Sequence, residues 1–177
     1  TDAIAREAST ATAFGYGATL GRAELREAIA RKLVRRGAPA HVVGATHQVM
    51  VTAGANQAYM NAVLALADEG DAGVLFAPFY FNHHMAHTLS SVVCEVLPCR
   101  VGTWQPDLDA LRARLFESRG KPRVKTVTLC NPCNPTGAVY DGALLEEAQR
   151  LTSLVGAFLV VDNTYEDFVF DEARKHE

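Results

Sequence analysis

The sequence predicts an α/β fold in which a mostly parallel sheet is covered by helices on both faces. Short apolar runs alternate along the chain with segments whose apolar residues recur every three to four positions. These are the patterns of buried strands and amphipathic helices, and their regular alternation builds parallel strand-helix-strand units. Glycine and polar residues also gather where a strand-like run gives way to a helix-like one. In a parallel sheet this is the edge that binds ligands.

The elements follow in order along the chain. Leu25, Ile29 and Leu33 recur at helical spacing, and Gly37 and Pro39 end the pattern, so the first helix is expected over residues 22–36. Further helices are expected over residues 55–68, from Pro78 to about Ser90, and over 108–117 and 143–154. Strands are expected over residues 49–52, 74–77, 92–97, 124–129 and 158–161.

Composition limits the class of protein. The 177 residues carry a net charge of -3, with 49% hydrophobic and 21% charged residues, which fits one domain with a sizeable core. Because there is no basic surplus, we expect no nucleic-acid partner. No apolar run approaches the roughly 18 residues of a membrane span, and no signal pattern opens the chain. We therefore expect a cytoplasmic protein that does not bind membranes.

Four cysteines raise the question of a metal site. Cys130 and Cys133 have CxxC spacing, but they follow a strand within a proline-rich loop, and Cys94 and Cys99 are too far apart to complete a usual zinc site. We expect no metal, and buried or half-buried thiols in a reducing compartment.

Three histidines follow the second expected strand, residues 74–77. On a helix, His83 and His87 would share one face at a spacing that can bind zinc, but no acidic residue lies near them in sequence. We expect His83, His84 and His87 to be surface or interface residues.

The strand-to-helix turn at residues 51–57 has the form of an anion site. Gly54 lets the backbone approach a ligand, and a helix begins with free N–H groups at Ala55 and Asn56. An ordinary turn with Asn56 as the helix cap is an equal alternative for this segment alone. The glycine-rich run at residues 15–21 fails the dinucleotide-binding pattern, because a leucine stands at its third glycine position.

Three further turns carry candidate ligand-binding residues. Tyr80 lies among three aromatics after a strand, where it can stack on a planar ring or pack in the core. Asn134 lies in the stiff sequence NPCNPTG, residues 131–137, and its amide can donate a hydrogen bond to a ring oxygen. Asp162 ends an apolar strand and therefore needs a partner, which can be a protonated pyridine nitrogen, an arginine or a helix N-terminus.

Together these motifs resemble the fold-type I pyridoxal-phosphate enzymes, and within them the class I/II aminotransferases, nearest to the aromatic and methionine aminotransferase branch. The specific parts are NPCNPTG and Asp162-x-x-Tyr165, supported by the residues around Gly54 and Tyr80. The resemblance covers roughly residues 14–170. It implies the three-layer α/β/α large domain of this fold, incomplete here, with residues 1–37 as an N-terminal segment and helix and 38–177 as a partial cofactor-binding domain.

The resemblance also implies a role for each residue around the cofactor ring. Asp162 would keep the pyridine nitrogen of pyridoxal 5'-phosphate protonated. Asn134 and Tyr165 would hydrogen-bond the phenolic oxygen of the ring, and Tyr80 would stack on its face.

Further implied contacts concern the phosphate, the subunits and the substrates. The amides of Ala55 and Asn56 would bind the phosphate, and Tyr16 would reach the cofactor of the other subunit, which implies a homodimer. The substrates would be amino acids and 2-oxo acids.

The chain departs from the family in one respect. The lysine that holds the cofactor covalently lies beyond the Asp-x-x-Tyr motif in these enzymes, and this sequence ends at Glu177 before it. Lys32, Lys121, Lys125 and Lys175 lie in charged or polar surroundings that do not suit a nucleophile. We therefore expect no catalytic residue within these 177, a sequence truncated at its C-terminus, and no transamination by this chain alone.

Several alternatives stay open. The chain can be a catalytically inactive short relative that binds the cofactor weakly or acts only as a partner subunit. Carbon-sulfur lyases and synthases share the same fold and most of these motifs. An unrelated nucleotide-binding α/β domain is disfavoured by the failed glycine pattern and by the absence of a phosphate-binding GxxxxGK[ST] loop.

Overall fold

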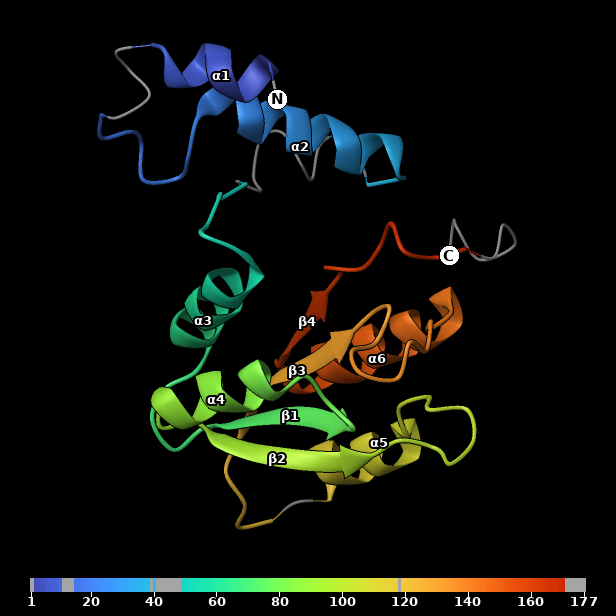
Figure 1. The fold of residues 1–177 in the computed structure, drawn as a ribbon. Helices are drawn as coiled ribbons and strands as arrows, with labels where there is room; N and C mark the ends of the chain where they lie inside the picture. Colours follow the sequence, from blue (N-terminus) through green and yellow to red (C-terminus); the bar gives the residue numbers. More distant parts are fainter. Residues whose placement is uncertain (1, 11–14, 39, 41–48, 118, 171–177) are drawn as a thin grey trace. The chain divides into compact units, whose positions relative to one another are not determined.

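The computed structural model describes residues 2–10, 15–38, 40, 49–117 and 119–170 (Figure 1). The chain forms two compact units, Thr1–Thr52 and Ala53–Glu177. Among the described residues, no helix is long and apolar enough to span a membrane.

The first unit contains two helices. Helix α2 (Ala23–Arg35) confirms the helix expected over residues 22–36, whereas α1 (Asp2–Ala8) was not expected from the sequence. The strand expected over residues 49–52 is wrong, because this segment has no regular secondary structure and belongs to no sheet. It is held by single hydrogen bonds: Val51 N donates to Leu20 O at 3.0 Å, and Arg26 Nε donates to Val49 O at 2.6 Å.

The second unit is built on a four-stranded parallel sheet. Its strands lie in the order β2-β1-β3-β4, and their bounds are Ala72–Ala77 for β1, Val93–Pro98 for β2, Val124–Cys130 for β3 and Phe158–Asp162 for β4. Each strand lies where the sequence predicts it, within two residues at either end. The central strands β1 and β3 are almost wholly buried, and the outer strands β2 and β4 are partly exposed.

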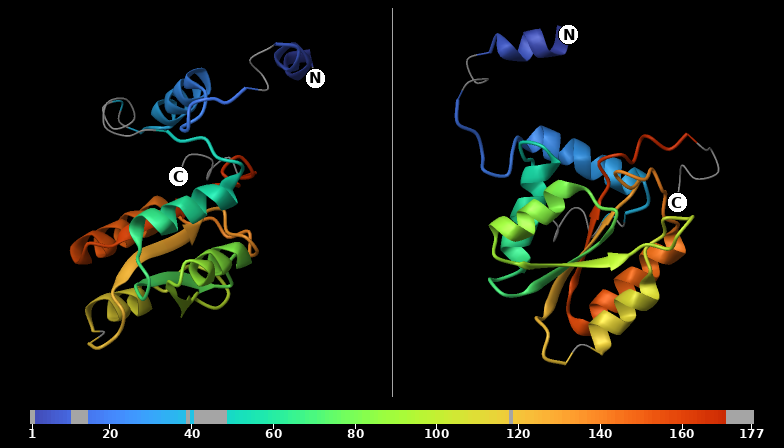
Figure 2. Two further views of the ribbon diagram at one scale, coloured as in Figure 1. Left: turned by 90° about the vertical axis from the view of Figure 1, so that its left-hand side faces the viewer. Right: turned by 60° about the horizontal axis from the view of Figure 1, so that its bottom comes forward.

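Four helices cover the sheet, as the sequence predicts, and their bounds are Ala55–Leu66 for α3, Phe81–Leu89 for α4, Leu108–Phe116 for α5 and Gly142–Val155 for α6. Helices α3 and α4 pack together on one face and α5 and α6 on the other (Figure 2). This arrangement confirms the predicted α/β fold with three layers. The side chains of Asp107 and Asp141 cap α5 and α6 by accepting hydrogen bonds from first-turn amides, and α6 ends at Gly156 in the left-handed conformation.

Two apolar cores follow from this layering. The larger lies between the sheet and the helix pair α5 and α6, and includes the fully buried Leu111, Leu129 and Leu151. The smaller joins Tyr59 and Val63 of α3 to Ala86 of α4 and to Val92. Both cores hold the helices so that the strand-to-helix turns lie at the carboxyl edge of the sheet.

Candidate functional site

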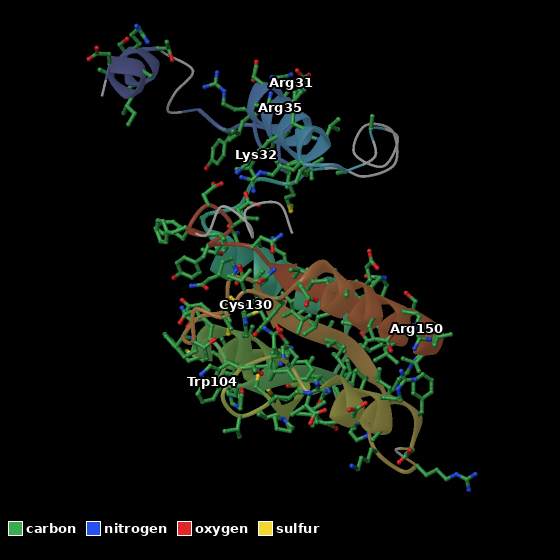
Figure 3. The ribbon with its side chains drawn as sticks, turned by 90° about the vertical axis from the view of Figure 1, so that its right-hand side faces the viewer. Arg31, Lys32, Arg35, Trp104, Cys130 and Arg150 are labelled. Atoms are coloured by element: carbon green, nitrogen blue, oxygen red, sulfur yellow. The ribbon has the colours of Figure 1, made fainter. Side chains whose placement is uncertain are left out.

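A hollow of about 220 Å³ lies at the carboxyl edge of the sheet. The strand register places Cys130, the last residue of β3, beside Asp162, the last residue of β4, so the loops that follow both strands leave the sheet together. Figure 3 shows the side chains of this edge, with Cys130 labelled. The hollow is lined by Ala53, Gly54, Ala55, Asn56, Tyr80, Cys130, Asn134, Asp162, Thr164 and Tyr165.

The structure thus brings six of the predicted site residues around one hollow: Ala55, Asn56, Tyr80, Asn134, Asp162 and Tyr165. The seventh, Tyr16, lies in the first compact unit, where its side chain is fully exposed.

Asp162 is held by two partners. Its Oδ2 lies 3.0 Å from Nε2 of His83, and because an ionised carboxylate can only accept, the imidazole N–H donates this hydrogen bond. Its Oδ1 accepts from the amide N of Thr164 at 3.0 Å and from its Oγ1 at 2.6 Å. The hydrogen bond from His83, aided by those from Thr164, lowers the pKa of the Asp162 carboxyl to about 2. Asp162 therefore presents a negative charge to the hollow at neutral pH.

The sequence reasoning missed both partners of Asp162, His83 and Thr164. The expectation that the histidines lie at the surface is wrong for two of them, because the side chains of His83 and His87 are 3% and 0% exposed; His84 is exposed as expected. Helix α4 turns the face of His83, Ala86 and His87 inward.

A signal for this burial is present in the sequence, but a stronger one hides it. Positions 83, 86 and 87 have the spacing of a buried helix face. On the same helix Phe81, Met85 and Leu89 form an apolar stripe, and the structure leaves that stripe exposed. An apolar stripe ordinarily marks the buried face, so the sequence of α4 by itself points to the wrong face.

The N-terminus of α3 forms a second part of the hollow. Ala55 and Asn56 are the first two residues of the helix, and their amides have no acceptor within it. The alternative in which Asn56 caps the helix is wrong, since Gly54 occupies the cap position and no side chain caps it. Gly54 has φ 86° and ψ 167°, a conformation essentially restricted to glycine. The partial positive charge of this 12-residue helix therefore adjoins the hollow.

The loop of residues 131–137 follows β3 and is hydrogen-bonded to the end of β4. Asn131 N donates to Asp162 O at 2.9 Å, and Asn131 Oδ1 accepts from Tyr140 N at 2.8 Å. The amide of Asn134 lies 3.5 Å from Cys130 Sγ, which fixes the backbone of Asn134 beside the hollow. Cys130 and Cys133 are free buried thiols, as expected, and burial raises the pKa of Cys130 to about 11.

Two tyrosines supply aromatic surface. The Tyr80 hydroxyl accepts a hydrogen bond from Asn82 Nδ2 at 2.8 Å, and its ring meets that of His83 edge to face, with centroids 5.5 Å apart. The Tyr165 ring is 38% exposed and packs edge to face on Phe168. Both rings line the hollow, so a planar ligand can be contacted through its face or edge.

This set of groups fits pyridoxal phosphate. An anionic carboxylate suits the protonated ring nitrogen, the first amides of a helix suit the phosphate, and an amide side chain with two tyrosines suits the ring and its oxygen. All of them adjoin the same hollow.

The fold and this hollow define a cofactor-binding domain of the pyridoxal-phosphate type. Residues 1–176 match the family described as aminotransferase class I and II, and the chain belongs to that family. Members of this family depend on pyridoxal phosphate, so the cofactor expected from the sequence is confirmed.

Three relatives illustrate the similarity. The chain is 42% identical over 157 residues to the aromatic aminotransferase ISS1 of Arabidopsis thaliana, covering 88% of this chain and 38% of that protein. It superposes on N-succinyldiaminopimelate aminotransferase of Mycobacterium tuberculosis with a TM-score of 0.79 and 30% identity, over 98% of this chain and 42% of the other. The methionine aminotransferase YbdL of Escherichia coli gives a TM-score of 0.81 and 25% identity, over 99% and 44%. The chain thus spans less than half the length of each relative.

Proposed function

We propose that this chain forms the cofactor-binding core of an aminotransferase that moves an amino group between an amino acid and a 2-oxo acid. The observation that carries this proposal is the Asp162 carboxylate, kept anionic in a hollow that also receives the N-terminus of α3. Family membership and the aminotransferase names of its relatives support the same activity. In this proposal the cofactor-binding domain comprises residues 38–177 and follows an N-terminal segment and helix at residues 1–37.

Each residue of the hollow has a defined task in this proposal. When bound, pyridoxal phosphate supplies a conjugated ring that withdraws electrons from the alpha carbon of the amino substrate. Asp162 holds the proton on the ring nitrogen, and His83 and Thr164 keep both carboxylate oxygens in place. Asn134 and Tyr165 bind the phenolic oxygen, and Tyr80 orients the ring by packing against it.

The remaining contacts bind the phosphate and the second subunit. The amides of Ala55 and Asn56 hold the phosphate at the positive end of α3. In the proposed homodimer Tyr16 reaches the phosphate of the partner subunit. The cytoplasmic location stays a prediction.

The hollow contains no lysine among its lining residues. Binding and electronic tuning of the cofactor are therefore assigned to these residues, and a covalent link to the cofactor is not. Borohydride treatment in the presence of the cofactor is expected to leave no specific adduct on any of the four lysines of this sequence. Stoichiometric reduction at one of them, located by peptide mass spectrometry, contradicts the assignment.

Cofactor binding and amino transfer test the function directly. In equilibrium titrations of the purified protein with pyridoxal phosphate, Asp162→Asn is expected to raise Kd about tenfold to a hundredfold, because the charge that pairs with the ring nitrogen is lost. Asp109→Asn makes the same charge change at an exposed position on α5 and is expected to leave Kd unchanged. Transfer of a 15N label from methionine or an aromatic amino acid to a 2-oxo acid, measured in a polypeptide that carries this chain together with the lysine that holds the cofactor, then reports the reaction. If such a polypeptide binds the cofactor and transfers no label from any amino acid, the proposal is contradicted.

A further inference from the structure

A buried tyrosine lies behind the hollow without lining it. Tyr59 is one helical turn beyond Ala55 on α3, and its side chain is 6% exposed. Its hydroxyl lies 2.8 Å from Thr128 Oγ1 on β3 and 3.2 Å from His87 Nε2 on α4. Burial raises the pKa of this phenol, so the hydroxyl stays neutral. The hydroxyl thereby ties α3 to both the sheet and the neighbouring helix.

The ring of Tyr59 contacts the histidine that holds Asp162. Its centroid lies 4.1 Å from that of the His83 imidazole, with the planes inclined by 36°. Tyr80 contacts the same imidazole with its ring nearly perpendicular, at 88°. Two tyrosines therefore limit the rotation of His83, and of these Tyr80 faces the hollow while Tyr59 lies on the core side.

Strand β1 leaves space for His87, one of the two partners of the Tyr59 hydroxyl. A side chain on Gly73 of β1 would clash with the ring of His87, so this strand leaves room for the imidazole. Burial lowers the pKa of His87 to about 4, which keeps the ring neutral and able to accept from Tyr59. A phenylalanine would keep the ring but lose both contacts of the hydroxyl, so the hydroxyl and its two partners hold the ring in one position.

We propose that Tyr59 is a positioning residue that holds His83 in the orientation in which its Nε2–H donates to Asp162. The inference rests on the proposed function, because the orientation of Asp162 matters only for a ligand in the hollow. Tyr59 touches neither the hollow nor the carboxylate and acts through His83 alone.

Two readouts test this role in the purified protein. The first is the side-chain 15N–1H resonance of His83 Nε2 in the cofactor-free protein, which reports the hydrogen bond to Asp162. The second is Kd for pyridoxal phosphate. Tyr59→Leu is expected to shift or broaden the His83 resonance and to raise Kd about tenfold. Tyr59→Phe keeps the ring and is expected to raise Kd about threefold.

A matched control separates positioning from general loss of stability. Val63→Ala damages the same small core one turn further along α3 and removes neither a ring contact nor the hydrogen bond of His83. It is expected to lower Tm while leaving the resonance and Kd as in the wild type. An unchanged His83 resonance in Tyr59→Leu, or an equal change in Val63→Ala, overturns the inference. If Tyr59→Leu does not fold, Tyr59→Phe decides by the same resonance.

A double-mutant cycle shows whether Tyr59 acts through His83. In a His83→Asn background Tyr59→Leu is expected to have no further effect on Kd, whereas additive effects overturn the inference. The outcome is separable from the proposed function. Failure of the wild-type protein to bind pyridoxal phosphate refutes that function, while the His83 resonance of the cofactor-free protein still decides the role of Tyr59.

Discussion

Mild acid is expected to destabilise the domain through His87. Its side chain is fully buried between α4 and the sheet, and burial lowers its pKa from 6.5 to about 4. Between pH 6.5 and pH 4 the His87 side chain is therefore protonated in the unfolded chain but not in the folded one. The free energy of unfolding is highest above pH 6.5 and falls as the pH is lowered toward 4. At 1.36 kcal/mol per unit of pKa difference, the loss between pH 7 and pH 5 is about 2 kcal/mol, and the full loss is about 3 kcal/mol.

Urea unfolding at pH 7, 6 and 5 measures this loss. His87→Gln keeps an acceptor for Tyr59 but cannot be protonated, so it is expected to remove most of the pH dependence in this window. His84→Gln is the matched control, because His84 lies on the same helix and is exposed. Equal pH dependence in the wild type and in His87→Gln refutes the reasoning, as does its loss in His84→Gln.

Three further predictions concern single residues. Gly54→Ala is expected to cost about 1–3 kcal/mol in thermal or urea unfolding, because no atom within 4 Å opposes a side chain there and the penalty is the backbone conformation alone. Leu151→Ala, in the larger core, is expected to cost about 2–5 kcal/mol, whereas the 61% exposed Leu154 of the same helix changes stability by less than about 0.5 kcal/mol when replaced by alanine. The pKa of the Asp162 carboxyl is lowered from 3.8 to about 2, so above pH 4 its charged form is expected to contribute about 2 kcal/mol to the free energy of unfolding. This contribution is lost as the pH falls to 2. Acid unfolding of Asp162→Asn, compared with the wild type, measures that contribution.

Local pattern was sufficient for most of the fold. The apolar run that becomes β3 and the amphipathic run that becomes α6 are bounded by turn and capping residues, so their positions follow from the chain itself. Helix α1 was missed because its sequence DAIAREA favours a helix by composition but has only one large apolar residue to mark a buried face. The run at residues 49–52 reads as a strand, yet a strand exists only where a neighbour pairs with it. The order of the strands is likewise a tertiary property.

The candidate site likewise has a part that could be predicted from the sequence and a part that depends on tertiary packing. Because the carboxyl ends of parallel strands share one edge, turns far apart in sequence could be placed together, and Asn134 and Asp162 do line one hollow. His83 could not be identified as a partner of Asp162, because its position depends on which face of α4 packs inward. That face carries His83 and His87, and the tertiary packing of α4 against α3 and the sheet buries it in place of the apolar stripe.

The most direct test of the central claim is the 15N chemical shift of the ring nitrogen in 15N-labelled pyridoxal phosphate bound to the protein. If Asp162 contacts that nitrogen, the wild type and Asp109→Asn are expected to show a protonated ring nitrogen at neutral pH, and Asp162→Asn an unprotonated one. The same shift in Asp162→Asn as in the wild type contradicts the assignment of Asp162 and with it the proposed orientation of the cofactor.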